Sequence, residues 1–257
     1  MDKFEVHLVE HCNLKCQCCD NYSSIAEEEY TDEIIFRNDM ERMSQLFPEV
    51  KVIRLLGGEP LLHPNITFFL NESRKYFPNA EIRLSTNGVL LSKMPTKFWK
   101  ACSKNKIVIE ITYYPIDIDI ETVKDTADTF EVEVISFDRV KPKTKTSHRN
   151  PINDKKNQDV NYNFRHCYQV NHCISLKDGK IYPCTCIPNV YHFNKYFNKN
   201  LEITDNDFID IHTHSLEEIE TFLKNPVPFC AYCNVKNRTC GKPWATTKYD
   251  IKEWFDE

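Results

Sequence analysis

The stretch HCNLKCQCCDNY, residues 11 to 22, places four cysteines within eight positions, directly after a segment with the pattern of a first β-strand. Three of them, Cys12, Cys16 and Cys19, have the spacing C-x3-C-x2-C. Three thiolates on one loop can hold three irons of a cubane cluster and leave the fourth iron open, and sulfur ligands favour iron–sulfur or zinc. Structural zinc usually takes four ligands in two nearby pairs. Here the fourth local thiol, Cys18, is adjacent to Cys19 and should point elsewhere.

Composition limits the function classes. The chain has 257 residues, 41% hydrophobic and 12% aromatic, which is enough for one large domain or a domain with an appendage. Its net charge of -5 comes from charges mixed along the sequence, so we expect no nucleic acid partner. We see no apolar signal core and no membrane-spanning stretch, and we expect a reducing cytoplasm. In that compartment, twelve cysteines favour metal or redox use over disulfides.

The first half predicts alternating strands and helices. Strand-like segments begin at Phe4, Val50, Ala80, Lys106 and Phe130, with helix-like sequence between them. This rhythm is typical of βα units and a parallel sheet. Helices are expected at 66–76, 96–103 and 121–129, and one after Thr31 as N-cap that Pro48 stops.

Two polar motifs follow the second and third predicted strands. Gly57, Gly58, Glu59 and Pro60 combine two glycines, which allow close approach to the backbone, with a carboxylate suited to a cationic amino group. Ser85, Thr86 and Asn87 supply hydroxyls and a turn. Sites in such barrels lie at the carboxyl ends of strands, where both motifs and the cysteine loop fall.

Together these motifs make the sequence similar to the radical S-adenosylmethionine (SAM) enzymes over roughly residues 4–137. The resemblance implies a partial (β/α)6 TIM-like barrel of α/β class. It implies a [4Fe-4S] cluster on Cys12, Cys16 and Cys19 whose open iron binds SAM, and reductive cleavage of SAM to a 5'-deoxyadenosyl radical. Gly57 to Pro60 match the GGEP motif that contacts the SAM ammonium, and Ser85, Thr86 and Asn87 are further expected SAM contacts. One departure is Cys18, where the family often has an aromatic residue.

A second cysteine group lies downstream. Cys167 and Cys184 form C-x11-G-x4-C around a predicted hairpin with an Asp178-Gly179 turn, and Cys230 and Cys233 form C-x2-C. Four thiolates with no open position suit a [4Fe-4S] cluster or zinc. The pattern resembles the SPASM and twitch extensions of radical SAM enzymes. Because the later SPASM cysteines do not follow, the twitch form is preferred, a small cysteine-rich α+β domain with one auxiliary [4Fe-4S] cluster on these four thiols. Cys102 is expected in a helix interior, whereas Cys18, Cys173, Cys186 and Cys240 are spare thiols, substitute ligands or hydrogen donors.

We expect a barrel core over 1–140, a connecting loop with a further barrel element over 141–166, and the twitch-like domain and tail over 167–257. Tyr113 and Arg149 are the predicted catalytic residues. Other position-based candidates are Tyr114, Arg139, His148 and Arg165.

An auxiliary cluster suggests dehydrogenation of an alcohol, in which it accepts the electron. In length and cluster arrangement the chain resembles the twitch-type aminocyclitol dehydrogenase of butirosin biosynthesis. The expected partners are a small-molecule substrate (a sugar, cyclitol or nucleotide sugar) and a flavodoxin- or ferredoxin-type reductant. The alternatives are an epimerase with a cysteine hydrogen donor, a peptide-modifying SPASM-type enzyme, and a zinc-binding structural module.

Overall fold

The computed structural model describes residues 1–137 and 146–256. Arg139 and the first residues of the predicted connecting loop lie outside this range. The chain divides into two compact units, one comprising Met1–Val9 and Tyr30–Lys145, the other Glu10–Glu29 and Thr146–Glu257. The cysteine loop after the first strand therefore packs within the second unit, a grouping that the sequence did not suggest.

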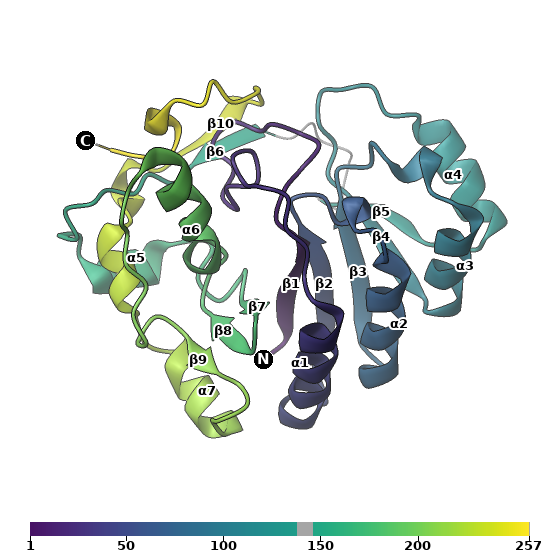
Figure 1. The fold of residues 1–257 in the computed structure, drawn as a ribbon, viewed down its shortest axis with the longest axis horizontal. Coiled ribbons are helices and arrows are strands. Elements are labelled where there is room, and N and C mark those ends of the chain that lie inside the picture. Colours follow the sequence, from purple (N-terminus) through teal and green to yellow (C-terminus); the bar gives the residue numbers. More distant parts are fainter. Residues whose placement is uncertain (138–145, 257) are drawn as a thin grey trace. The chain divides into compact units, whose positions relative to one another are not determined.

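The first unit contains the predicted parallel sheet, in the order β5-β4-β3-β2-β1. Its strands are β1 (Lys3–Val9), β2 (Val52–Gly57), β3 (Glu81–Thr86), β4 (Ile107–Ile111) and β5 (Val134–Ser136). Its helices are α1 (Glu33–Leu46), α2 (Ile66–Tyr76), α3 (Thr96–Lys104) and α4 (Ile120–Thr129), with short 3-10 turns at Pro60–Leu62 and Leu91–Lys93. Figure 1 shows α1, α2 and α3 side by side along the sheet. The ends of β1, β2, β3 and β4 thus each lead into a loop and a helix, as the sequence rhythm predicted.

The end of β2 approaches β1 so closely that only glycine fits there. Gly57 has φ +150°, and a Cβ on it would lie 2.2 Å from the carbonyl oxygen of Val9. The next residue, Gly58, donates its N–H to that same oxygen at 2.7 Å. One function of the Gly-Gly pair is therefore to let two strand ends meet.

One detail of α1 corrects the sequence prediction. The N-cap is Asp32, whose carboxylate accepts the N–H groups of Ile34 and Ile35 at 2.8 and 3.0 Å. Thr31, the predicted cap, instead donates its hydroxyl to the carbonyl of His7 at 2.6 Å. Both residues have the short oxygen-bearing side chain of a cap, and a carboxylate also suits the positive end of the helix dipole.

The second unit mixes helices with short antiparallel strands. The predicted hairpin is confirmed as β7 (Ser175–Lys177) and β8 (Lys180–Tyr182), with Asp178 and Gly179 both at positive φ, and β9 (Ile209–Asp210) pairs with β8. A separate pair joins β6 (Thr146–Arg149) and β10 (Thr239–Pro243). Its helices are α5 (Val160–His166), α6 (Cys186–Phe197) and α7 (Leu216–Leu223), with 3-10 turns at Pro228–Tyr232, Val235–Asn237 and Ile251–Glu253.

The segment 141–166, expected to be a connecting loop with a further barrel element, contains the strand β6 and the helix α5, and the helix α6 was not predicted. The α6 sequence carries proline, asparagine and aromatic residues, which are weak helix formers. Its stability comes from burial, because Ile187, Val190 and Phe193 lie in the core of the second unit. Tyr22 and Ile25, from the segment after the first cysteines, lie in the same core.

No helix in the described part of the chain is long and apolar enough to cross a membrane.

Candidate functional site

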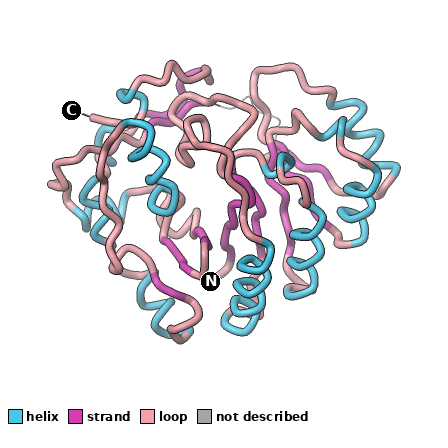
Figure 2. Tube along the Cα trace, in the orientation of Figure 1, coloured by secondary structure: helices cyan, strands magenta, loops and turns pink. Residues whose placement is uncertain are grey.

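The cysteine loop, residues 10–29, contains no helix or strand and is drawn as loop in Figure 2. The C-terminal segment holds it in place. Residues 15–17 pair with residues 245–247 through two backbone hydrogen bonds of 2.8 and 2.9 Å. Farther along, the indole N–H of Trp254 donates to the carbonyl of Cys19 at 3.0 Å. The loop is therefore fixed on both sides of its second cysteine by contacts within its own unit.

Backbone N–H groups point at two of the loop thiols. The N–H of Leu14 donates to the Cys12 sulfur at 3.3 Å, and backbone N–H groups of Asn21 and Ser23 hydrogen-bond the Cys19 sulfur. Burial raises the pKa of Cys19 to about 12, and the neighbouring Cys16 thiol adds to this rise. A cluster must displace such protons, since metals bind the thiolate. Backbone N–H groups aimed at sulfur are the hydrogen bonds that tune iron–sulfur clusters.

In the first unit, Glu59 connects the end of β2 to the end of β3. Its carboxylate accepts the hydroxyl of Thr86 at 2.7 Å and the backbone N–H groups of Asn87 and Leu61 at 2.9 and 3.1 Å. The side chain is fully buried, and that burial raises its pKa to about 7 although the three hydrogen bonds oppose the rise. The predicted contact of Glu59 with an ammonium group stays a prediction. The structure adds a role in holding the Ser85–Asn87 turn.

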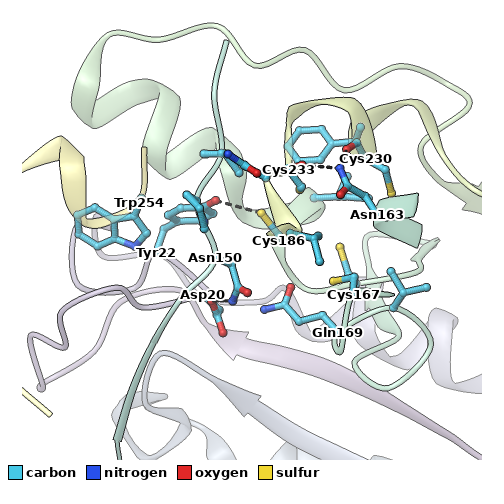
Figure 3. Close-up of a pocket in the computed structure, with 18 residues that line it drawn as sticks. Asp20, Tyr22, Asn150, Asn163, Cys167, Gln169, Cys186, Cys230, Cys233 and Trp254 are labelled. Atoms are coloured by element: carbon cyan, nitrogen blue, oxygen red, sulfur yellow. Dashed lines mark hydrogen bonds between the residues drawn. The ribbon is translucent and has the colours of Figure 1, made fainter. Parts of the chain in front are cut away.

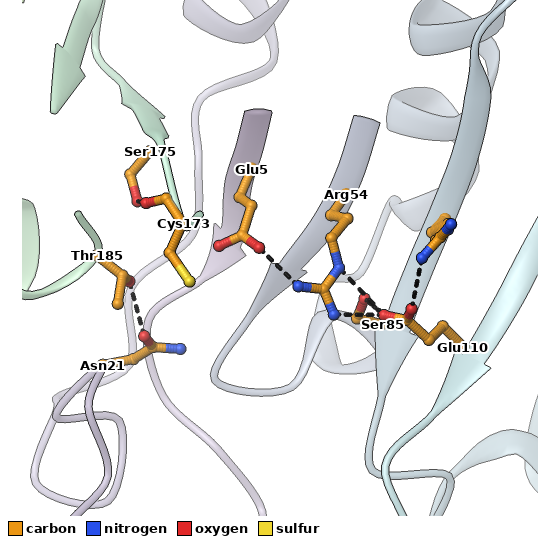
Figure 4. A network of polar contacts seen from close by, with 9 residues as sticks. Glu5, Asn21, Arg54, Ser85, Glu110, Cys173, Ser175 and Thr185 are labelled. Carbon is orange, nitrogen blue, oxygen red and sulfur yellow. Dashed lines mark hydrogen bonds and ion pairs between the residues drawn. The ribbon is translucent and has the colours of Figure 1, made fainter. Parts of the chain in front are cut away.

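A charged network lies on one face of the same sheet (Figure 4). Arg54 of β2 donates to Glu5 of β1 at 2.6 Å and to Glu110 of β4 at 3.1 Å. Glu110 also accepts the hydroxyl of Ser85 at 2.6 Å and a guanidinium N–H of Arg83 at 3.0 Å. These partners lower the pKa of Glu110 although its burial acts in the opposite direction. The predicted SAM contacts Ser85 and Thr86 thus both have internal partners.

Sequence reasoning missed this network, although a signal was present. Glu5, Arg54 and Glu110 are charged residues inside otherwise apolar strand segments. Neighbouring strands pair Glu5 with Arg54, and Arg54 with Arg83, so the charges fall on one face. Charged residues at paired positions of adjacent parallel strands can indicate a network of buried ion pairs, because buried charges need partners of opposite charge.

The second unit contains a cavity lined by all four thiols of the predicted auxiliary site, Cys167, Cys184, Cys230 and Cys233 (Figure 3). Cys167 ends α5, Cys184 follows the hairpin, and the other two lie at the 3-10 turn Pro228–Tyr232 and its end. Three segments far apart in the sequence thus meet as the spacing required.

Backbone N–H groups also point at sulfur atoms of this cavity. Backbone N–H groups of Gln169 and Val170 hydrogen-bond the Cys167 sulfur, and that of Ile187 hydrogen-bonds Cys184. Burial raises the pKa of Cys230 to about 12. The Asn163 amide donates to the Cys230 carbonyl at 2.8 Å and also to the Cys233 carbonyl, so α5 fixes the C-x2-C turn.

A fifth thiol, Cys186, lines the same cavity. The Tyr22 hydroxyl lies 3.0 Å from its sulfur, as the dashed line in Figure 3 marks. The pKa of the Cys233 thiol is raised, mainly by a hydrogen bond with Cys186 and then by burial. From the sequence, Cys186 was interpreted as either a spare thiol or a substitute ligand. Its position beside Cys233 agrees with both interpretations.

Within residues 1–137 and 146–256, no three His, Cys, Asp or Glu side chains converge tightly enough to hold a single metal ion. A cubane cluster differs from a single ion, because each thiolate binds a separate iron corner.

The predicted catalytic residues lie in different units. Tyr113 follows β4 and is half-buried, which raises the pKa of its hydroxyl. Arg149 ends β6, and its guanidinium pairs with Asp256 at 2.7 Å and donates to the carbonyls of Lys252 and Phe255. Arg165 is exposed on α5. No substrate role follows for them from these contacts, and the assignments stay predictions.

Comparison with known proteins gives one family match and several partial likenesses. The model of the Radical SAM superfamily matches residues 6–153, more than half of the chain. The GTP 3',8-cyclase of Trichodesmium erythraeum (strain IMS101) is 34% identical over 107 residues, which are 39% of this chain and 32% of that protein. The chain thus matches about a third of the length of that curated relative.

Two solved structures share the fold over most of the chain. BtrN in complex with AdoMet and 2-DOIA has a TM-score of 0.56 at 18% identity and covers 91% of this chain and 93% of that one. Native anSMEcpe with bound AdoMet has a TM-score of 0.52 at 12% identity, over 90% and 83%. These likenesses concern the fold, and they confirm the predicted α/β class with a mostly parallel sheet.

Proposed function

This chain belongs to the radical SAM superfamily, and from that premise we propose that it removes two hydrogens from an alcohol of a small polar substrate, a sugar, cyclitol or nucleotide sugar. When bound, SAM and its [4Fe-4S] cluster supply the 5'-deoxyadenosyl radical that takes a hydrogen atom, and an auxiliary [4Fe-4S] cluster accepts the remaining electron. A base takes the proton, so atoms and electrons balance. The protein supplies binding, orientation and redox tuning.

The residues of this chain have separate tasks in that proposal. Cys12, Cys16 and Cys19 would hold the first cluster, and the backbone N–H groups near Cys12 and Cys19 would donate hydrogen bonds to its sulfur ligands. Glu59 keeps the β2 and β3 ends together, and its carboxylate would be the partner of the SAM ammonium. Glu110 orients the Ser85 hydroxyl.

One observation carries the proposal of an oxidation: the four thiols named for the auxiliary site line one cavity. The donor set is all sulfur and its count closes the coordination of a cubane. Zinc also accepts four thiolates, so the donor set alone supports either metal. An iron cluster has the redox chemistry that a dehydrogenation needs, whereas zinc has none.

The relatives do not decide the substrate. The name GTP 3',8-cyclase belongs to proteins that share about a third of their length with this chain, and 2-DOIA belongs to a structure at 18% identity. We therefore propose the substrate class from the reaction type, and expect a hydroxylated small molecule.

The test counts iron and sulfide after anaerobic reconstitution. The native chain should bind about eight irons, and a Cys184→Ala, Cys230→Ala double variant about four, because a cubane holds about four irons. Cys186→Ala tests the fifth thiol of the same cavity: about eight irons would show that Cys186 is not a ligand, and fewer would show that it is. The Cys12, Cys16, Cys19 triple-alanine variant should lose the other four and all formation of 5'-deoxyadenosine.

Zinc in place of the second four irons, or four irons in the native chain, would remove the electron acceptor. An epimerase or another redox-neutral reaction would then be favoured, with Cys186 or Cys173 as a possible hydrogen donor to test. Undiminished 5'-deoxyadenosine formation by the triple variant would contradict the whole mechanism.

A further inference from the structure

A second hollow in the second unit is lined by charged side chains and by the cysteine loop. Gln17 and Cys18, which lie between the ligand positions Cys16 and Cys19, form part of its wall. The remaining lining comes from β6, β10 and the C-terminal segment: Ser147, Arg149, Thr239, Lys242, Lys248, Asp250, Lys252 and Glu253. We call this surface the loop groove.

Some charged side chains of the loop groove have hydrogen-bond or ion-pair partners, and others have none within the part of the chain that the structure describes. Arg149 is neutralised by Asp256 at 2.7 Å, and the buried carboxylate of Glu253 accepts the Thr247 hydroxyl at 2.6 Å and the Lys248 N–H at 2.7 Å. The three lysines Lys242, Lys248 and Lys252 are exposed, and among the described residues none of their amines forms an ion pair. The exposed carboxylate of Asp250 lies in the same groove and accepts the backbone N–H of Lys252 at 3.0 Å. In a chain with net charge -5, three lysines without ion pairs against this one exposed carboxylate leave an excess of positive charge beside the cysteine loop.

We propose that the loop groove is the docking surface for an acidic one-electron carrier protein, an inference that rests on the proposed radical SAM chemistry and names its electron source. The balance is simple: the reduced carrier loses one electron, the first cluster gains it, and no bond or proton is transferred between the two proteins. A carrier seated here contacts residues 17–18 of the loop that holds the cluster.

The side chains favour a protein surface over a small anion. Compact phosphate or carboxylate sites typically use the bidentate fork of arginine, and Asp256 already occupies the guanidinium of Arg149. Lysines act as point charges on flexible stems, and several of them around a concave surface attract an acidic partner and speed its association. The groove therefore suits steering and loose docking.

The experiment compares the reconstituted chain of residues 1–257 with the triple variant Lys242→Gln, Lys248→Gln, Lys252→Gln. The matched control neutralises three exposed lysines of α3, Lys97, Lys100 and Lys104. The probe is a reduced acidic flavodoxin. Its dissociation constant and the rate at which it reduces the cluster are measured at low and high salt, beside SAM cleavage driven by dithionite.

We expect the groove variant to bind flavodoxin about tenfold more weakly at low salt and to be reduced correspondingly more slowly, because steering charges are lost. The difference should shrink at high salt through screening. Dithionite-driven SAM cleavage, iron content and the α3 control should match the native chain.

Equal flavodoxin affinity in all three proteins would overturn the docking assignment. So would a groove variant that loses dithionite-driven activity or has a raised KM for the small substrate, since the groove would then serve a small anion or the fold. Failure of the native chain to cleave SAM with dithionite would instead count against the proposed function. If the triple variant does not fold, Lys248→Gln alone is compared under the same conditions.

Discussion

Glu59 is fully buried at a strand end, with a carboxylate that three hydrogen bonds favour and desolvation opposes. Desolvation wins, because the pKa is raised to about 7. In the folded chain the group is therefore largely protonated at acidic pH, whereas in the unfolded chain it ionises near its ordinary pKa of 4.5. A carboxyl held in this way links the stability of the first unit to pH.

The sign of that link follows from proton binding. Between pH about 4.5 and 7 the folded state holds a proton that the unfolded state releases, so stability falls as pH rises through this window. At about 1.4 kcal/mol per pKa unit, the fall is on the order of 3 kcal/mol. Urea unfolding of the native chain and Glu59→Gln at about pH 5 and about pH 8 measures it, since only the native chain should carry this component. Parallel pH profiles for the two proteins would show that Glu59 titrates normally.

At the scale of elements, the sequence predicted what depends on local patterns. The helix of residues 66–76 was predicted with its observed bounds, and α7 begins at a local capping box formed by Ser215 and Glu218. The hairpin at Asp178-Gly179 formed because both residues tolerate positive φ. These signals lie within a few residues of the structure they specify.

Long-range features could not be predicted in the same way. The α6 helix is stabilised by a core that includes Tyr22 and Trp254, and no local pattern reports such partners. The Arg54 network needs the register of four strands, and the meeting of residues 15–17 with 245–247 spans almost the whole chain. For the site, spacing predicted four thiols of the cavity, but only the fold placed Cys186 among them.

The contact between the C-terminal segment and the cysteine loop has a testable consequence. Trp254→Phe keeps an aromatic ring beside Tyr22 but removes the N–H that donates to Cys19, worth about 1 kcal/mol. We expect lower iron retention at the first cluster after gel filtration, seen as a weaker signal of the reduced cluster by electron paramagnetic resonance. Trp99→Phe, in the buried face of α3, is the control that disturbs packing without touching the loop. Equal retention in both variants would mean that the loop holds itself.

At the scale of the whole molecule, the second unit is assembled from two distant pieces of chain. Residues 10–29 supply Tyr22 and Ile25 to its hydrophobic core, and Glu10 accepts from Lys177 at 2.9 Å and lies 3.1 Å from His192. The loop proposed to hold the first cluster and the domain proposed to hold the second are thus parts of one folded body.

A fragment of residues 146–257 should therefore fail to form a stable domain, because it lacks core side chains and leaves Lys177 and His192 without their buried partner. Burying Tyr22 and Ile25 is worth roughly 1.5–3 kcal/mol for each large apolar side chain, a large share of the stability of a small domain. We expect the fragment to show no cooperative thermal transition and no iron after reconstitution. Addition of a peptide of residues 10–29 should restore part of both, whereas a peptide with Tyr22→Ala and Ile25→Ala should not. A fragment that melts cooperatively and binds about four irons by itself would show that the two pieces fold independently, and that only the cysteine loop depends on the contact between them.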